Sequence, residues 1–169
     1  MYLHPLLGDH NPLIDRIAHH FSTIGLAGTD LLAIDHLCYR VETLSRYSQL
    51  KAQLSATDIL VDESEINGRP ISIFRLSNPL THGLYEITAL ELPAPLESKP
   101  YKEGFEHAEF LVPSLKEFKE DYFMVDFDQK DLGKEVNPCL ALKIDDIGVK
   151  FHEKHILDVV RIQRETGKL

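Results

Sequence analysis

The sequence predicts an α+β fold in which two tandem βαβββ modules form a curved mixed sheet around a cleft, with a helix at each end of the chain. Three observations support this prediction. Segments with strand and helix periodicity alternate along the chain. One strand-helix unit recurs without a gap at an offset of 71 residues, which places His36 on His107. Each unit covers its sheet on one side only, so the tandem copy is its natural partner.

The first helix is expected within an N-terminal extension, residues 1–30, because Asn11 can cap a helix and Pro12 suits its first position. The first module follows over residues 31–95. Its expected elements are a strand at 34–41, a helix capped by Thr43, and strands at 59–66, 70–76 and 84–92. The Asn67-Gly68 pair between two apolar runs predicts a tight hairpin.

Prolines and glycine mark residues 96–104 as a linker, and residues 105–169 form the second module with the last helix. A strand is expected at 105–112, and the Ser114–Glu117 capping box opens a helix. A weak strand with a turn is expected within 124–136, followed by strands at 139–144 and 149–152. The final helix begins near His155, and all of these parts are expected to pack as one compact domain.

The composition narrows the classes of partner. The 169 residues carry 18 Lys and Arg against 27 Asp and Glu, a net charge of −9, so neither a nucleic acid nor a membrane is the expected partner. No apolar run approaches the length of a membrane span, and the opening residues do not resemble a signal peptide. Cys38 and Cys139 suggest reduced, buried residues of a cytoplasmic protein. The expected partner is a small molecule, and the expected state is a monomer or a homodimer.

The repeat gives the histidines an arrangement. His36 and His107 open equivalent strands and point away from the apolar face, while Glu91 and His152 lie near the ends of the last strands of the two modules. Three imidazoles and one carboxylate suit one divalent ion such as Zn²⁺, Fe²⁺, Ni²⁺ or Mn²⁺. His155 is a possible substitute for His152. The alternative is that each of these side chains is an ordinary hydrogen-bonded or solvated group, as we expect for the other histidines.

The sequence supports other kinds of catalytic site less well than a metal site. The chain has no nucleophile elbow, no glycine-rich phosphate loop and no HExxH motif. Cys38 and His36 share a strand face, but a nucleophilic pair also needs an acid that orients the imidazole, and none is evident.

Several stretches resemble a known family. They are DHLCYRV at 35–41, INGRPISIFRL at 66–76, ELP at 91–93, KPYKEGFEHAEFLVP at 99–113 and NPCLALKIDDIGVKFH at 137–152. The chain resembles the YecM family, within the vicinal-oxygen-chelate superfamily that includes glyoxalase and bleomycin-resistance proteins. The resemblance implies a cleft between two βαβββ units with metal ligands on their first and last strands, here His36, Glu91, His107 and His152. His152 departs from the metalloisomerase pattern, in which a second glutamate is usual.

Two functions follow as hypotheses. The first is a metalloenzyme whose ion acts as a Lewis acid on a small oxygen-bearing substrate, in an isomerase-, lyase- or dioxygenase-like reaction. Glu109 is the candidate base or ligand-orienting residue, and Arg40 and Lys150 are the candidates for holding an anionic substrate. The second is a non-catalytic protein that binds or sequesters a small molecule in the same cleft. An interaction module whose cleft holds no ligand is a third possibility.

Overall fold

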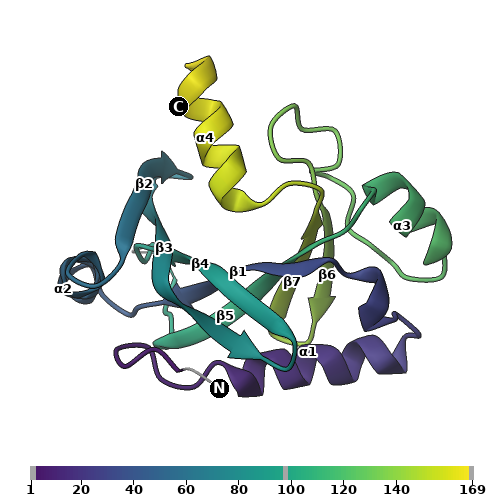
Figure 1. Cartoon of the computed structure of the whole chain (residues 1–169), viewed down its shortest axis with the longest axis horizontal. Helices are drawn as coiled ribbons and strands as arrows, with labels where there is room; N and C mark the ends of the chain where they lie inside the picture. Colours follow the sequence, from purple (N-terminus) through teal and green to yellow (C-terminus); the bar gives the residue numbers. More distant parts are fainter. Residues whose placement is uncertain (1–2, 97–98, 168–169) are drawn as a thin grey trace.

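The computed structural model describes residues 3–96 and 99–167; residues 97 and 98 of the expected linker lie outside the described residues. Figure 1 shows its helices and strands. In chain order they are α1 (Asn11–Thr23), the short 3-10 helix η1 (Gly28–Asp30), β1 (Ala33–Arg40), α2 (Leu44–Ser55), β2 (Ile59–Ile66), β3 (Arg69–His82), β4 (Tyr85–Pro93), β5 (Gly104–Leu111), α3 (Leu115–Asp121), β6 (Leu140–Ile144), β7 (Ile147–His152) and α4 (Ile156–Thr166).

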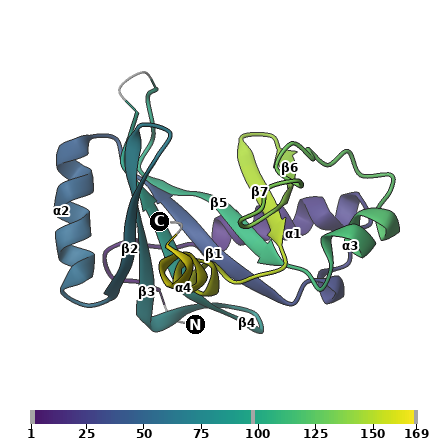
Figure 2. The same ribbon diagram turned by 90° about the horizontal axis from the view of Figure 1, so that it is seen from above.

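All seven of these strands form one mixed sheet in the order β2-β3-β4-β1-β5-β7-β6. The two modules meet at its centre, where β1 pairs antiparallel with β5. Each of these strands has the last strand of its own module on its other side, in parallel: β4 beside β1 and β7 beside β5. Figure 2 shows the curvature of the sheet, with α2 outside one module and α3 outside the other. The predicted α+β class is confirmed.

The first module forms as its sequence predicts, except that β3 continues to His82, beyond the strand expected at 70–76. Thr43 caps α2 by accepting a hydrogen bond from the backbone N–H of Arg46 at 3.1 Å. Tyr47, Leu50 and Leu54 of the expected apolar stripe of α2 are buried, whereas Leu44 at the start of the helix is exposed. Asn67 and Gly68 both have positive φ, 54° and 76°, as a type I′ turn requires, so β2 and β3 form the expected hairpin.

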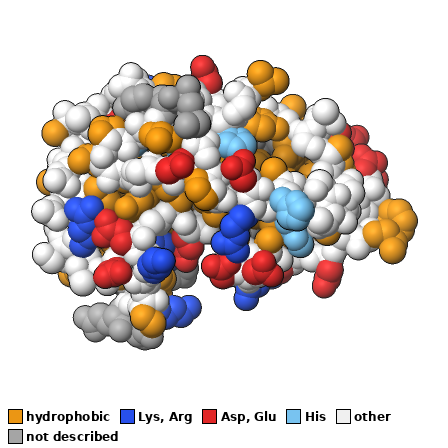
Figure 3. All heavy atoms as spheres, turned by 90° about the horizontal axis from the view of Figure 1, so that it is seen from below, with side chains coloured by type: hydrophobic (Ala, Val, Ile, Leu, Met, Phe, Trp, Pro, Cys, Tyr) orange, Lys and Arg blue, Asp and Glu red, His pale blue; other side chains and the backbone are white. Residues whose placement is uncertain are grey.

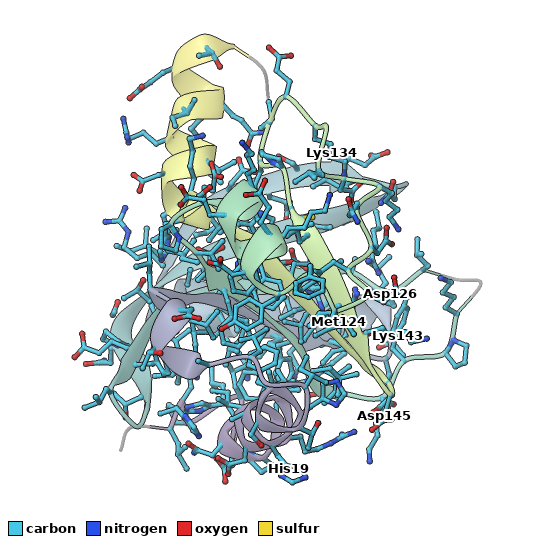
Figure 4. All side chains as sticks on the ribbon, turned by 90° about the vertical axis from the view of Figure 1, so that its right-hand side faces the viewer. His19, Met124, Asp126, Lys134, Lys143 and Asp145 are labelled. Atoms are coloured by element: carbon cyan, nitrogen blue, oxygen red, sulfur yellow. The ribbon has the colours of Figure 1, made fainter. Side chains whose placement is uncertain are left out.

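The second module is shorter than the sequence suggested. Among the described residues, the segment between α3 and β6 contributes a single antiparallel bridge, Asp128 to Ala141, in place of the strand expected within 124–136. This segment is polar, so it offers the sheet no continuous apolar face to bury. Figure 4 views the molecule from this side and labels Met124, Asp126 and Lys134 along the segment. The second unit is therefore βαββ with one additional bridge.

The N-terminal extension packs against the domain. Helix α1 begins one residue earlier than predicted: His10 is its N-cap, and the exposed Asp9 carboxylate accepts the backbone N–H of Asn11. His4 and His10, which the sequence assigned to a tail, are both buried. The α1 side chains Ile14, Ile17 and Phe21 are buried, and Figure 1 shows α1 beneath the sheet. Figure 3 views the molecule from that side, where acidic and basic side chains are interspersed.

Helix α4 lies on the opposite face from α1. Figures 1 and 2 place it above β1 and β4, with its first residues following directly from β7. Val159 and Val160 are its buried side chains. Cys38 and Cys139 are buried free thiols, as expected. Over residues 3–96 and 99–167, no helix is long and apolar enough to cross a membrane.

Candidate metal centre

The register of the central strands gathers the candidate residues. Across the β1–β5 ladder, His36 lies opposite Glu109 and Cys38 lies opposite His107. In the parallel ladder on the other side of β1, Cys38 is the partner of Glu91. Positions two apart on a strand share a face, and partners across a ladder lie side by side. The pairing therefore brings His36, His107, Glu91 and Glu109 to one face of the sheet.

Two β-bulges place an acid beside each histidine. The register of β1 skips Asp35 between Ile34 and His36, and the register of β5 skips Glu106 beside His107. The extra residue of a bulge is unpaired, and the local bend re-aims its side chain. Sequence neighbours on a regular strand point to opposite faces, but here each acid reaches the ring next to it. The Asp35 carboxylate lies 3.0 Å from Nδ1 of His36, and the Glu106 carboxylate lies 3.2 Å from Nδ1 of His107.

These acids fix the orientation of both rings. An ionised carboxylate only accepts hydrogen bonds, so Nδ1 of each histidine donates and Nε2 is left to face the cluster. Asp35 is fully buried, and the Arg40 guanidinium holds Glu106 from its other side. Burial raises the pKa of Glu106, but His107 and Arg40 outweigh burial and lower that pKa to about 2. Glu106 is therefore an anion under all ordinary conditions.

The ring nitrogens that face the cluster are suited to a metal ion. Nε2 of His36 and Nε2 of His107 are buried and have no hydrogen-bond partner among the described residues. Each lies 3.9 Å from an oxygen of Glu91, and the ligand atoms of these three residues all lie within 4.8 Å of one another. Ligands of one ion stand about 3–3.5 Å apart, so only small side-chain rotations separate this arrangement from a coordination shell. The donor set of two imidazoles and one carboxylate fits a divalent transition-metal ion.

Glu109 lies at the edge of the same cluster. Its Oε1 is 3.8 Å from Nε2 of His36 and 3.6 Å from Nε2 of His107. Lys150 donates to Oε1 at 2.6 Å, and Nε2 of His152 lies 2.5 Å from Oε2. Burial raises the pKa of Glu109, but the surrounding basic side chains, His36 foremost, lower it well below its usual range. Glu109 is thus a buried carboxylate compensated from several sides.

The structure separates His152 from the other expected ligands. Its Nδ1 donates to the carbonyl of Pro138 at 3.0 Å, and its Nε2 is held by Glu109. The register explains the difference, because Lys150 lies opposite Glu109 on β7 as Glu91 lies opposite Cys38 on β4. The position equivalent to Glu91 is therefore Lys150, and His152 lies two residues further along the strand. His155, the possible substitute, caps α4 through the backbone N–H of Leu157.

Arg40 and Lys150 mainly contact protein groups. The Arg40 guanidinium binds Glu106 and lies over the Tyr101 ring, 5.1 Å from its centre. The side chain of Lys150 is 41% exposed although its ammonium binds Glu109. A cavity of about 260 Å³ lies beside His107 and Lys150. Gly148, which has no side chain, also lines it. This cavity is large enough for a small molecule next to the cluster.

Comparison with known proteins agrees with the fold. The sequence pattern of the YecM protein family matches residues 3–163. The chain belongs to the YecM family. Protein YecM of Escherichia coli (strain K12) is 27% identical over 159 residues, which cover 85% of this chain and 84% of that protein.

Two solved structures show how far the fold likeness extends. The structure described as "Structural Genomics, Protein EC4020" has a TM-score of 0.74 at 25% identity, covering 90% of this chain and 87% of that one. A methylmalonyl-CoA epimerase from Mycobacterium tuberculosis has a TM-score of 0.55 at 14% identity, covering 75% of this chain and 91% of the epimerase. The YecM-family chain thus has the vicinal-oxygen-chelate fold, which by itself does not assign a reaction.

Sequence reasoning did not single out Asp35 and Glu106. The sequence alone gives no evident acid to orient His36, but in the structure the preceding residue, Asp35, contacts Nδ1 of that ring. A signal was available, since an acidic residue precedes each repeated histidine at the same offset of 71. A regular strand would point these acids away from the rings, and only the bulges overturn that expectation.

Proposed function

We propose that this protein is a divalent-metal-dependent enzyme of the vicinal-oxygen-chelate type, with His36, Glu91 and His107 as the ligands. The observation that carries the proposal is the pair of buried, unpartnered Nε2 atoms, each on a ring whose Nδ1 is held by a carboxylate. This pattern is typical of metal-binding histidines. Two imidazoles and one carboxylate leave other coordination positions open for a substrate.

The substrate proposed for this site is a small molecule with a carbonyl or a pair of oxygens. A bound divalent ion would supply Lewis acidity toward such an oxygen. The cavity beside His107 and Lys150 would hold the remainder of the substrate. Lys150 is the cation best placed to attract an anionic group there, because its side chain is half-exposed. Arg40 would act indirectly, by fixing Glu106 and through it the His107 ring.

Glu109 would be the proton acceptor. Its Oε1 faces both imidazoles, so it adjoins the place where a substrate bound by the three ligands would react. His152 and Lys150 hold the carboxylate in position. Proton abstraction beside a carbonyl is the reaction class that this arrangement supports best. The epimerases with this fold are consistent with that class.

A specific observation favours the second candidate, binding without turnover. Both oxygens of Glu109 are already held, Oε1 by Lys150 at 2.6 Å and Oε2 by His152 at 2.5 Å, and hydrogen bonds to the charged form make a carboxylate a weaker base. A sequestering protein would need the three ligands and the cavity but no proton acceptor. Exchange of substrate α-protons with deuterated solvent distinguishes the two candidates, because only the enzyme catalyses this exchange.

Metal analysis of the untagged protein tests the ligand set. The protein, reconstituted separately with Zn²⁺, Fe²⁺, Ni²⁺ and Mn²⁺, should bind one ion per chain. His36→Ala, Glu91→Gln and His107→Ala should each abolish stoichiometric binding. His82→Ala is the matched control, because His82 pairs with Asp15 away from the cluster. If the wild-type protein binds none of these ions, or if His107→Ala binds as the wild type does, the proposal is wrong.

A further inference from the structure

The first turn of α4 is hydrogen-bonded to the candidate metal centre through one buried carboxylate. The backbone N–H of Ile156, the first residue of α4, donates to Oδ1 of Asp35 at 2.8 Å. The other oxygen of Asp35 lies 3.0 Å from Nδ1 of His36. Two hydrogen bonds thus connect the backbone of α4 to a ring whose free nitrogen faces Glu91 and His107.

Asp35 depends on these two donors. It is fully buried, and an ionised carboxylate in such surroundings is costly unless donors compensate it. The first N–H groups of a helix have no partner within the helix, and the helix dipole favours an anion at that end. Nδ1 of His155 also lies 3.4 Å from Oδ1 of Asp35. This nitrogen accepts the backbone N–H of Leu157, so while the ring is neutral it has no hydrogen to donate to Asp35.

Helix α4 is held in place at both ends. At its start, Nε2 of His155 lies 3.3 Å from Oγ1 of Thr88 on β4. Near its end, Arg164 donates to the carbonyl of Val61 and lies 3.5 Å from the Asp62 carboxylate on β2. The helix therefore spans from β4 to β2 at the edge of the first module, and Figures 1 and 2 show it above the sheet. Displacement of α4 would remove the Ile156 donor from Asp35.

We propose that Asp35 is a positioning residue that couples the docking of α4 to metal affinity at His36, an inference that rests on the proposed function. With α4 docked, Asp35 is fixed and holds His36 in the tautomer and orientation that present Nε2 to the ion. Coupling between two binding equilibria is reciprocal, so a bound ion stabilises the docked helix by the same factor.

A single substitution isolates the Ile156 hydrogen bond. Ile156→Pro removes the N–H, and proline is well accepted at the first position of a helix. The preceding His155 has φ −64° and ψ 139°, an extended conformation compatible with a following proline. Ile156→Ala is the matched control, because it removes the same side chain and keeps the N–H. Leu44→Pro introduces proline at the first position of α2, away from the cluster.

Zn²⁺ and Mn²⁺ affinities of the full chain, measured by competition with a chelator, give the first readout. We expect Ile156→Pro to bind roughly tenfold more weakly than Ile156→Ala, and Leu44→Pro to match the wild type. Asp35→Asn, which keeps the shape and loses the charge, should weaken binding by about 10–100-fold. If Ile156→Pro is too unstable to titrate, the metal affinity of Asp35→Asn relative to the wild type tests the inference.

Hydrogen exchange gives a readout independent of any activity. Adding Zn²⁺ to the wild type should slow amide exchange in the first turn of α4, and in Asp35→Asn this protection should be lost. Three results would each overturn the inference. The first is equal metal affinity of Ile156→Pro and Ile156→Ala, and the second is unchanged metal affinity of Asp35→Asn. The third is an amide exchange rate in α4 that does not change when the ion is added. A wild-type protein that binds no ion would instead count against the proposed function, which keeps the two failures distinct.

Discussion

At the scale of single residues, the candidate site depends on the acid that precedes each histidine. Asp35 and Glu106 differ in surroundings although they occupy equivalent places in the repeat. Asp35 is fully buried and compensated by a helix N-terminus, whereas Glu106 is compensated by the Arg40 guanidinium. Both arrangements hold a carboxylate next to Nδ1 of an imidazole. The two modules thus reach the same ring orientation by different means.

Glu106→Gln tests this role in the second module. Glutamine keeps an acceptor for Nδ1 of His107 but loses the charge that makes the ring a strong ligand, and it frees Arg40. We expect metal affinity to fall by about 10–100-fold. Competition titration with a chelator measures the change. Glu117→Gln, on α3, should leave the affinity unchanged; an equal loss in both variants would show a general charge effect instead.

At the scale of elements, the two equivalent helices are capped in the same way. Oγ1 of Thr43 accepts the N–H of Arg46 at 3.1 Å, and Oγ of Ser114 accepts the N–H of Glu117 at 3.2 Å. Thr43→Ala and Ser114→Ala should each lower the free energy of unfolding by about 1 kcal/mol. Chemical denaturation measures both. Serine at position 43 should restore most of the loss, because it supplies the same acceptor; a failure to restore would point away from capping.

A cluster of side-chain hydrogen bonds joins α2 to the β2–β3 hairpin. The Glu63 carboxylate on β2 accepts hydrogen bonds from Lys51 and Tyr47 of α2 and from Ser72 of β3. The Lys51 ammonium foremost, with the two hydroxyls, lowers the pKa of Glu63 to about 2.

This lowered pKa predicts an acid-sensitive contribution to stability. A carboxyl whose pKa is lower in the folded state stabilises the fold above its unfolded pKa, and the contribution is lost as pH falls through the folded pKa. The loss should therefore occur between about pH 4.5 and pH 2. In Glu63→Gln the free energy of unfolding should change less steeply across that range. Identical slopes in the two proteins would contradict the prediction.

At the scale of the whole molecule, aromatic rings join the N-terminal helix to the second module. The ring of Phe151 on β7 is fully buried and lies within 6.1 Å, centre to centre, of four others, which are Phe21, Phe110, Phe118 and Phe127. These rings come from α1, β5, α3 and the segment that follows α3. The module with one strand fewer is thus stabilised by three rings from outside the sheet, in addition to Phe110 on β5.

Phe151→Ala should therefore destabilise the whole protein. Removing a buried ring typically costs about 3–5 kcal/mol in free energy of unfolding, because a cavity remains. The exposed Phe123 is the matched control, and Phe123→Ala should change stability by less than about 0.5 kcal/mol. Denaturant unfolding followed by circular dichroism measures both. A loss confined to the second module, seen as a separate transition, would contradict a single cooperative core.

Much of the architecture follows from the sequence, for local reasons. The Asn67-Gly68 turn and the capping residues Thr43 and Ser114 mark their elements by local chemistry that packing does not override. The repeat predicts that His36 and His107 occupy equivalent positions, because the two strand-helix units align at an offset of 71 residues. The strand expected within 124–136 is wrong, because whether a weak polar segment pairs is decided by the edge it meets, and here, within the described part of the chain, only Asp128 bridges to Ala141.

The sequence by itself determined the α+β class, the duplication and the pairing of His36 with His107, because periodicity and turn chemistry are local properties. Only the tertiary structure decided which residues surround the two imidazoles. The register placed Lys150, not His152, opposite Glu109, and the bulges turned Asp35 and Glu106 toward the rings. Register and bulges depend on how strands from distant parts of the sequence pair, and no single segment contains that information. The contact between α4 and Asp35 spans even more of the chain, 121 residues, and the fold alone creates it.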